Sequence, residues 1–443
     1  MRCDRKPLVL AAGPMQLRLQ DGELRYLCVR GKEVLRRVYF AVRGAYWDTI
    51  PAAIEEITVE RHDDRFVVEL TASCRSDIAV YAWTGRIEGR PDGTVSVVID
   101  GKALADFESP RIGLCVLFGG KVFAGQPYCL DRAGGGEVKG VFPAMISPQQ
   151  FANGFTALHG TTREGIGLTV SSPGMAFDME DQRNYGDSSY KAFTESGYGC
   201  PQVRAGDGGT HRLEISVRQG AETGRPTATV GDCVDAVLPR LSRVDVIEAG
   251  PEFVQINRSR EEYANARSIT IPFNPAVHLT DDEALMENIP AIVDQAATLR
   301  SFAPQARLHV GPVWFDTPYP RPQRDLCHRT AFATAWLVRF VKFAAIAGMD
   351  SIAVGLADGP WMAICDALSE HTGERLRAID AAPHRAIEVL AVEGGWQWVA
   401  NTTDAEQRAS VAREAATGCL AYAPYEVREY RSSGDNNDTF RER

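Results

Sequence analysis

Long apolar runs, paired cysteines and an excess of basic residues are all missing from this sequence. No stretch reaches the roughly 18 consecutive apolar residues that a membrane-spanning helix needs, and the apolar stretch from Leu8 to Ala12 is shorter than the core of a secretory signal. The 10 cysteines are scattered, without a CxxC pair or a Cys/His cluster at zinc spacing. We therefore expect reduced thiols, no metal site and a cytoplasmic protein.

Signatures of nucleic-acid and nucleotide binding are also missing. The formal net charge is −10, whereas nucleic-acid affinity depends on basic residues that neutralise phosphates. The sequence contains no phosphate loop, no dinucleotide fingerprint and no Gly-x-Ser-x-Gly elbow. These absences exclude nucleic acid and common cofactors from our expectations, and they favour a small polar or neutral ligand.

Residues 1–240 show the period-two alternation of half-buried β-strands. Leu213, Ile215 and Val217 alternate with polar residues, and Asp21-Gly22 joins two extended runs as in a hairpin. Many short strands at this spacing predict an antiparallel β-sandwich. The segment from Val122 to Gly160 is rich in glycine and proline, so we expect it to consist mainly of loops.

The pattern changes to alternating strands and helices after about residue 250. Ile269–Phe273 reads as a strand, and Thr280 with Glu283 matches a capping box at the start of the next helix. Such repeats predict a parallel sheet, but a complete eight-stranded barrel needs about 250 residues. The predicted fold is therefore multi-domain α and β, with an antiparallel β-sandwich at 1–240, a truncated (β/α) barrel at 250–385, a small antiparallel β segment at 386–432 and a flexible tail at 433–443.

The densest group of polar side chains lies in FDMEDQRNYGDSSYK, residues 177–191. Here Glu180 or Asp181 is a candidate general base, and Arg183 is a candidate clamp for a carboxylate or an oxyanion. The alternative is a structural Asp–Arg pair that holds a turn, and the sequence alone favours that alternative slightly.

Further candidates for substrate contact follow strands, where ligands of α/β folds bind. Asn274 and His278 come after the first predicted strand of the second half, and Asp316 and Asp358 follow the next two strands. Gln126 lies in a turn of the first half. For each of them a structural role in a loop or a helix cap remains the alternative.

Several uncommon strings of the sequence agree in order and spacing with one family. They are LRLQDGELRYLCVRGKEVLRRVYFAVR, AGQPYCL, FPAMISPQQ, FDMEDQRNYGDSSYK, FNPAVHLTDD and AGMDSIAVGL. Over nearly all of the first 220 residues, and again from about 268 to 356, the sequence resembles the D-apionate lactonase family of bacterial sugar-acid catabolism. The resemblance implies a β-sandwich, a barrel akin to those of glycoside hydrolases, and hydrolysis of an aldonolactone such as D-apionolactone to its acid.

The sequence departs from the family pattern in two places. The family's chain is longer and has a complete barrel, whereas the front half is missing here between about residues 245 and 268. After AGMDS, where the resemblance implies a carboxylate, the chain has Gly355-Leu356-Ala357 and only then Asp358. Both departures favour chemistry at the cluster around Glu180, or a relative whose substrate has changed or whose catalysis is lost.

The leading hypothesis is a lactonase-type hydrolase without a cofactor. Lactone opening needs an activated water, stabilisation of the oxyanion and a proton for the leaving alkoxide. The base is assigned to Glu180 or Asp181 and the charge stabiliser to Arg183, with substrate hydroxyl contacts from Gln126, Asn184, Asn274 and His278.

Two other function classes stay open at this point. A glycoside hydrolase acting on a small glycoside would use two carboxylates about 5–10 Å apart, with Asp316 and Asp358 as the candidates. A carbohydrate-binding or subunit protein is the other class, because a half-length barrel leaves sheet edges that a homodimer would cover.

Overall fold

The computed structural model describes residues 7–45, 47, 49–76, 79–194, 201–218, 236–244, 250–314, 331–355, 361–377, 381–382, 386–411 and 419–431. The chain forms two compact units. Unit 1 comprises Met1–Gln182 and Ser189–Thr227, and unit 2 comprises Arg183–Ser188 and Ala228–Arg443. The short segment Arg183–Ser188 thus belongs to unit 2, although strands of unit 1 precede and follow it.

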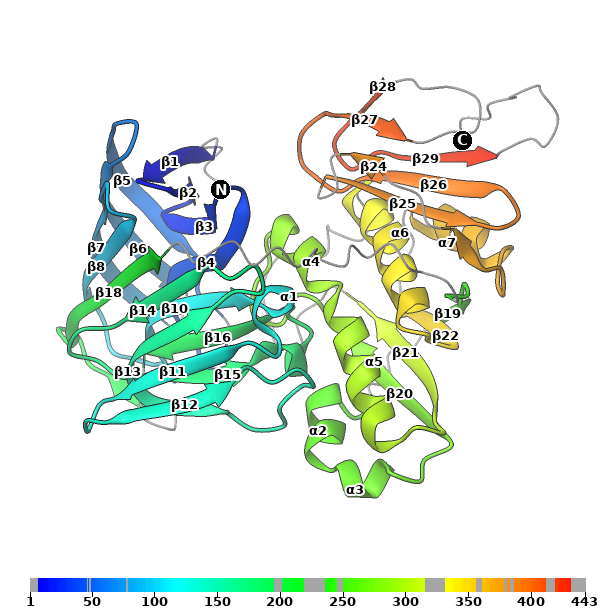
Figure 1. Cartoon of the computed structure of the whole chain (residues 1–443), viewed down its shortest axis with the longest axis horizontal. Helices are drawn as coiled ribbons and strands as arrows, with labels where there is room; N and C mark the ends of the chain where they lie inside the picture. Colours follow the sequence, from blue (N-terminus) through cyan, green and yellow to red (C-terminus); the bar gives the residue numbers. More distant parts are fainter. Residues whose placement is uncertain are drawn as a thin grey trace. The chain divides into compact units, whose positions relative to one another are not determined.

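Unit 1 is built from antiparallel strands, in agreement with the predicted fold class (Figure 1). Its main elements are β1 (Leu8–Ala12), β2 (Met15–Gln20), β3 (Glu23–Val29), β4 (Lys32–Val42), β5 (Ala52–Arg61), β6 (Phe66–Ser76), β7 (Ala79–Gly89), β8 (Thr94–Ala103), β9 (Phe107–Glu108), β10 (Ile112–Gly119), α1 (Gly120–Phe123), β11 (Pro127–Arg132), β12 (Glu137–Val141), β13 (Ala152–Thr161), β14 (Gly167–Ser171), β15 (Phe177–Asp181), β16 (Ser189–Thr194), β17 (Gln202–Val203) and β18 (Gly208–Arg218). A 3-10 turn, Gln182–Tyr185, follows β15.

One continuous sheet runs in the order β1-β2-β3-β4-β10-β16-β15-β13-β14-β18-β8-β7-β6-β5. The sheet folds back on itself, because Phe40 of β4 contacts Trp83 of β7 at 5.4 Å between ring centroids although many strands separate them in this order. The two halves enclose a single apolar core. The alternation at Leu213 and Ile215, both buried in this core, is confirmed.

Strands β4, β10, β16 and β15 show an apolar core on one face and polar side chains on the other. Phe40, Leu114 and Ala192 belong to the core. Residues at the intervening positions face the opposite side, and the register aligns Arg37 with Leu117, Leu117 with Lys191, and Lys191 with Glu180. Charged side chains from β4, β16 and β15, with Leu117 of β10 among them, therefore lie on this face of the sheet, which we call the polar face.

The expectation of loops between Val122 and Gly160 is wrong. β11, β12 and β13 pair within this segment, and Phe142 packs its ring 5.0 Å from that of Phe123 and 5.1 Å from that of Tyr190. Burial of aromatic rings outweighs the weak strand propensity of the glycines and prolines around them.

Unit 2 contains a parallel sheet with helices, followed by two small antiparallel sheets (Figure 1). Its elements are β19 (Arg240–Val244), α2 (Phe253–Arg258), α3 (Arg260–Tyr263), β20 (Ser268–Phe273), α4 (Asp282–Asn288), α5 (Ala291–Phe302), β21 (Arg307–Val313), α6 (Ala331–Ile346), β22 (Ser351–Gly355), α7 (Trp361–Ser369), β23 (Leu376–Arg377), β24 (Ala381–Ala382), β25 (Ile387–Val392), β26 (Trp396–Asn401), β27 (Gln407–Val411), β28 (Cys419–Tyr422) and β29 (Val427–Arg431).

The parallel sheet has the order β19-β22-β21-β20. Four strands are half of the eight in a closed barrel, which agrees with the truncated barrel of the predicted fold class. In a closed barrel the first strand of the chain pairs with the last. The pairing of β19 with β22 fits this arrangement, with the strands that would lie between β19 and β20 missing. The predicted domain boundaries themselves stay predictions.

The capping pattern in the sequence predicts the start of the helix after β20 to within one residue. Asp281, rather than the predicted Thr280, is the N-cap, because its side chain accepts a hydrogen bond from the Ala284 amide at 3.0 Å. Pro290 separates α4 from α5, as expected of a residue that cannot continue a helix.

The long helix α6 connects the parallel sheet with the C-terminal β-sheets. Its Trp336 and Phe340 rings stack on each other at 4.7 Å, and Phe340 lies 5.0 Å from Phe273 of β20. Arg339 donates to Glu388 of β25 at 2.6 Å. Contacts on opposite sides of α6 explain why this helix is apolar around most of its circumference.

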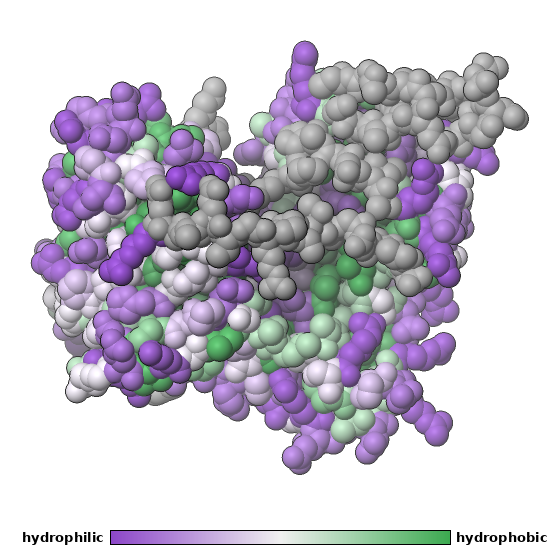
Figure 2. Space-filling model, viewed as in Figure 1, coloured by the Kyte–Doolittle hydropathy of each residue, from purple (hydrophilic) through white to green (hydrophobic). Residues whose placement is uncertain are grey.

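The edge strand β5 of unit 1 carries charged side chains on its surface. Edge strand β5 is mostly exposed, and hydrophilic side chains crowd this end of unit 1 in the face that Figure 2 shows. Charged side chains on an edge strand discourage pairing with other chains.

Among the residues that the structure describes, none of the helices has the length and apolarity to cross a membrane.

Candidate functional site

The polar face of unit 1 holds a carboxylate between cations. Lys191 donates to the Gln182 side chain at 2.9 Å, and its ammonium lies 3.2 Å from Glu180. The Lys191 side chain is only 3% exposed, whereas that of Glu180 is 20% exposed. Glu180 is therefore the member of the pair that a small solute reaches more readily.

Two arginines complete this cluster. Arg111 precedes β10 and places its guanidinium carbon 3.4 Å from the centroid of the Phe193 ring, and its charge interacts with Glu180. Arg43 follows β4, donates to the Tyr39 hydroxyl at 3.3 Å and interacts with the charges of Lys191 and Arg111. The pairing of β4 with β10 brings the two arginines together.

Positive charge dominates the cluster. Burial lowers the pKa of Lys191, and the neighbouring Glu180 carboxylate opposes that shift. Burial also lowers the pKa of Arg111 and raises the pKa of Tyr39 well above its usual value, so the phenol is neutral. Lys191 and Arg111 thus act on the Glu180 carboxylate, and Arg43 adds a third cation near both of them. This arrangement suits a ligand or transition state carrying negative charge.

Two hydrogen-bond donors of the cluster are buried without a protein acceptor. The Nε of Arg111 and the Nε2 of Gln182 make no hydrogen bond with the residues described. Buried donors are rarely left in this state, and a water or a ligand oxygen is the usual explanation. The cluster can therefore supply a carboxylate acceptor, an ammonium and additional donors at one place.

The structure separates the other predicted catalytic residues from Glu180. Asp181 points to the opposite side of β15 by strand alternation, and its carboxylate accepts from the Ser147 amide at 3.2 Å. Arg183 belongs to unit 2, where its fully buried guanidinium lies 3.3 Å from Asp294. The contiguous string thus contributes to three environments.

A second cluster forms within unit 2 around Asp187. Its carboxylate lies 2.6 Å from Nδ1 of His278 and accepts from Nδ2 of Asn288 at 2.8 Å. The Tyr185 ring meets the His278 ring edge-on at 5.3 Å. The carboxylate holds the imidazole in one orientation and favours the tautomer with a proton on Nδ1.

Other predicted contact residues lie near this second cluster or elsewhere. Asn184 accepts from Asn257 at 2.9 Å, and Asn274 accepts from the Ala276 amide at 2.8 Å. Gln126 is half-buried in the turn before β11, and its amide donates to Phe123 at 2.8 Å. Asp316 and Asp358 lie outside the described residues. The roles in substrate contact assigned to these residues and to His278 stay predictions.

Sequence reasoning missed Lys191, Arg111, Arg43, Asp187 and Asn288. Lys191 and Asp187 were inside the quoted string, but Arg43 and Arg111 had no local signal, because only strand pairing places them beside β16. Within the described part of the chain, no group of three or more His, Cys, Asp or Glu side chains is arranged to hold a metal ion.

Two family models match this chain. The model of the D-apionate lactonase N-terminal domain matches residues 2–220, and that of the D-apionate lactonase TIM barrel domain matches residues 250–383. A D-apionate lactonase of Brucella anthropi is 32% identical over 189 residues, which are 42% of this chain and 31% of that protein. The match thus spans about a third of the length of that relative.

Solved structures show more distant likenesses. A galactose 1-epimerase from Lactobacillus acidophilus is 8% identical, with 50% of this chain and 98% of that chain covered and a TM-score of 0.34. A beta-arabinopyranosidase is 10% identical, with 95% and 98% covered and a TM-score of 0.33. At these scores the likenesses support no inference about function.

Proposed function

Because the chain belongs to the D-apionate lactonase family, we propose that it hydrolyses a sugar lactone to the sugar acid, with the chemistry at Glu180 on the polar face of unit 1. The observation that carries this proposal is the partly exposed carboxylate of Glu180 held beside the buried ammonium of Lys191. The family supports the reaction, and the cluster supplies the groups that the reaction needs.

The reaction needs one base, one proton donor and positive charge at the carbonyl oxygen. Glu180 accepts a proton from a water molecule while the oxygen of that water forms a bond to the lactone carbonyl carbon. Lys191 and Arg111 stabilise the resulting oxyanion. When the intermediate collapses, the bond from the carbonyl carbon to the ring oxygen breaks, and the protonated Glu180 returns its proton to the leaving alkoxide. The product is the open hydroxy acid, which ionises at neutral pH.

The proposal is tested by proton release from a panel of aldonolactones in weak buffer with a pH indicator. Wild type should open one of them faster than the spontaneous rate. Glu180→Gln should lose about 100-fold or more of kcat, and Lys191→Met should lose about 100-fold. Glu69→Gln is the matched control, because Glu69 is an exposed carboxylate of the same unit, and its ion-pair partner among the described residues is the surface residue Arg86.

Each result discriminates between the assignments. Unchanged turnover in a folded Glu180→Gln variant would refute the role of Glu180, and loss in Asp181→Asn alone would move the base to Asp181. If no lactone is opened, the carbohydrate-binding role becomes the better account, and binding of sugars and sugar acids should then be measured.

We also propose that two copies of the chain associate through the parallel sheet of unit 2. Among the described residues, β19 and β20 each pair with one neighbour only. A two-fold axis parallel to the strands would place β20 of one copy beside β19 of the other, which gives the eight parallel strands of a closed barrel. Light scattering should then give twice the 48.5 kDa of the chain, and a monomer at every concentration would overturn the proposal.

A further inference from the structure

One face of the parallel sheet in unit 2 carries a polar row that no step of the proposed reaction uses. Ile269, Ile271 and their neighbours in the register, Leu308 and Val310, are buried. Phe273, two positions after Ile271, contacts α6, so these residues face the helices. The alternating positions form the other face of the sheet.

On that other face, one polar residue of each strand lies in register with the next. Thr270 pairs with His309, His309 with Ser351, and Ser351 with Arg240. Nδ1 of His309 lies 2.8 Å from the Ser351 hydroxyl oxygen. Thr270 and Arg240 are exposed, and His309 and Ser351 are half-buried. Parallel sheets normally bury apolar side chains on both faces, so a row of polar side chains on the face opposite the helices is unusual.

Arg240 is the one residue of this row with a full charge, and no described carboxylate forms an ion pair with it. Another arginine at this end, Arg307, lies 3.8 Å from Asp350. Asp350 also accepts from the Leu308 amide at 3.0 Å, so its charge is compensated within the protein. Positive charge therefore remains at Arg240.

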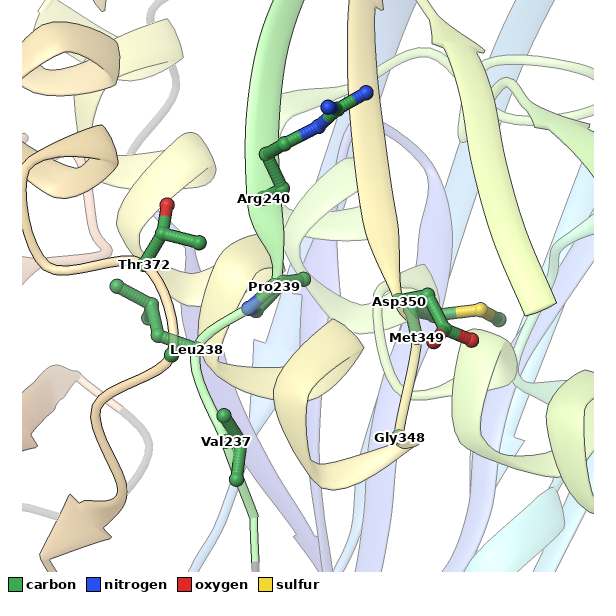
Figure 3. Close-up of a pocket in the computed structure, with 9 residues that line it drawn as sticks. Val237, Leu238, Pro239, Arg240, Gly348, Met349, Asp350 and Thr372 are labelled. Carbon is green, nitrogen blue, oxygen red and sulfur yellow. The ribbon is translucent and has the colours of Figure 1, made fainter. Parts of the chain in front are cut away.

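A cavity of about 400 Å³ adjoins the row at the amino ends of β19 and β22. Arg240, Met349, Asp350 and Thr372 are among its lining residues. Figure 3 shows the Arg240 side chain leaning from β19 towards β22, the strand that begins directly after Asp350. Of the row, Arg240 lines this cavity, so the cavity gives a small molecule space at the charged end of the row.

We infer that this face binds a small hydroxy carboxylate of the sugar-acid class, with its carboxylate on Arg240 and its hydroxyls on Ser351 and His309. Neighbouring strands lie about 4.8 Å apart, so Arg240 and His309 are about 10 Å apart at the backbone, with Ser351 between them. Guanidinium recognises carboxylate well, whereas hydroxyl and imidazole groups both donate to and accept from hydroxyls. The sugar-acid class rests on the proposed function, because it is the class of the lactonase product.

The test is calorimetric titration of the full chain with gluconate and with sorbitol, a neutral polyol of the same length. Wild type should bind gluconate more tightly than sorbitol. Arg240→Ala should weaken gluconate binding about tenfold or more and leave sorbitol binding unchanged, and His309→Ala should weaken both. Arg243→Ala is the matched control on the same strand, because Arg243 faces the other side and pairs with Asp366 of α7.

The titration is repeated in a Glu180→Gln background, and lactone hydrolysis is measured in Arg240→Ala. Gluconate binding that persists in Glu180→Gln and falls with Arg240→Ala supports the inference, even if no lactone is hydrolysed. Gluconate affinity that is the same in wild type and Arg240→Ala overturns it, even if hydrolysis at Glu180 is demonstrated. The two proposals therefore fail separately.

Discussion

Neutralising Glu180 and neutralising Lys191 should affect the stability of unit 1 very differently. The two side chains form a pair at 3.2 Å. Arg43 and Arg111 lie in the same cluster and carry positive charge, as Lys191 does. Glu180→Gln removes the carboxylate whose charge acts on both Lys191 and Arg111. Lys191→Met leaves the carboxylate with the charge of Arg111, so it remains compensated.

The magnitudes follow from burial and charge. Removal of one partner from a fully buried pair costs about 3–5 kcal/mol, and the 20% exposure of Glu180 reduces this value through solvent screening. We expect Glu180→Gln to lower the free energy of unfolding by about 2–3 kcal/mol. Lys191→Met should change it by less than about 1 kcal/mol, because loss of the pair is offset by relief from burying an ammonium.

Hydrogen exchange measured by mass spectrometry on peptides covering 177–194 gives the assay, because it reports unit 1 separately from unit 2. Lys102→Met provides a control, since Lys102 is an exposed residue of β8. Exchange in β15 and β16 should accelerate strongly in Glu180→Gln and little in Lys191→Met. Equal acceleration in both variants, or a larger effect of Lys191→Met, would refute the idea that surplus positive charge governs the cluster.

Three further perturbations have defined outcomes. Burial lowers the pKa of His211, so the unfolded chain binds more protons than the folded chain as the pH falls through about 6.5. The free energy of unfolding should therefore fall by up to about 1.4 kcal/mol per pH unit below that pH. Denaturation measured at pH 5–7 should show no such slope in His211→Gln. Glu388→Gln should destabilise β25 by about 3–5 kcal/mol, since Glu388 is 7% exposed and pairs with Arg339 and a lysine of α6; unchanged exchange in β25 would contradict this. Asp187→Ala should cost about 1–3 kcal/mol and remove the hydrogen-bonded Nδ1 proton signal of His278 from the NMR spectrum, and a retained signal would disprove the pairing.

Sequence patterns predicted the fold class because strands and helices each repeat their buried side chains with a characteristic period. Alternation at Leu213 and Ile215 predicts a half-buried strand, and the structure buries both residues in the core of unit 1. The strand–helix repeats after residue 250 likewise predict the parallel sheet. Local errors arose where two signals compete, as at Thr280 and Asp281, since either side chain is a good N-cap and only the course of the backbone decides between them.

The strands between Val122 and Gly160 were missed for a physical reason. Their residues are poor in local strand propensity, and β12 is mostly exposed. What holds the segment in the sheet is the packing of Phe142 and Tyr128 at 5.2 Å together with other rings, and such contacts join residues that are distant in sequence. Strand propensity reflects packing of this kind more than backbone preference.

The candidate site likewise depends on contacts between residues that are distant in sequence. In the string from Phe177 to Lys191, neighbours in sequence were treated as neighbours in space. Strand alternation sends Glu180 and Asp181 to opposite sides, and the turn that follows carries Arg183 into unit 2. The true neighbour of Glu180 is Lys191, eleven positions later and directly opposite on β16. In a β-protein, polar residues lie side by side when they share a row of the sheet, so the pairing register is a better guide to a candidate site than local density of polar residues. That criterion selects Glu180 with Lys191 in unit 1, and it selects His309 with Ser351 in unit 2, where no dense string drew attention to either residue.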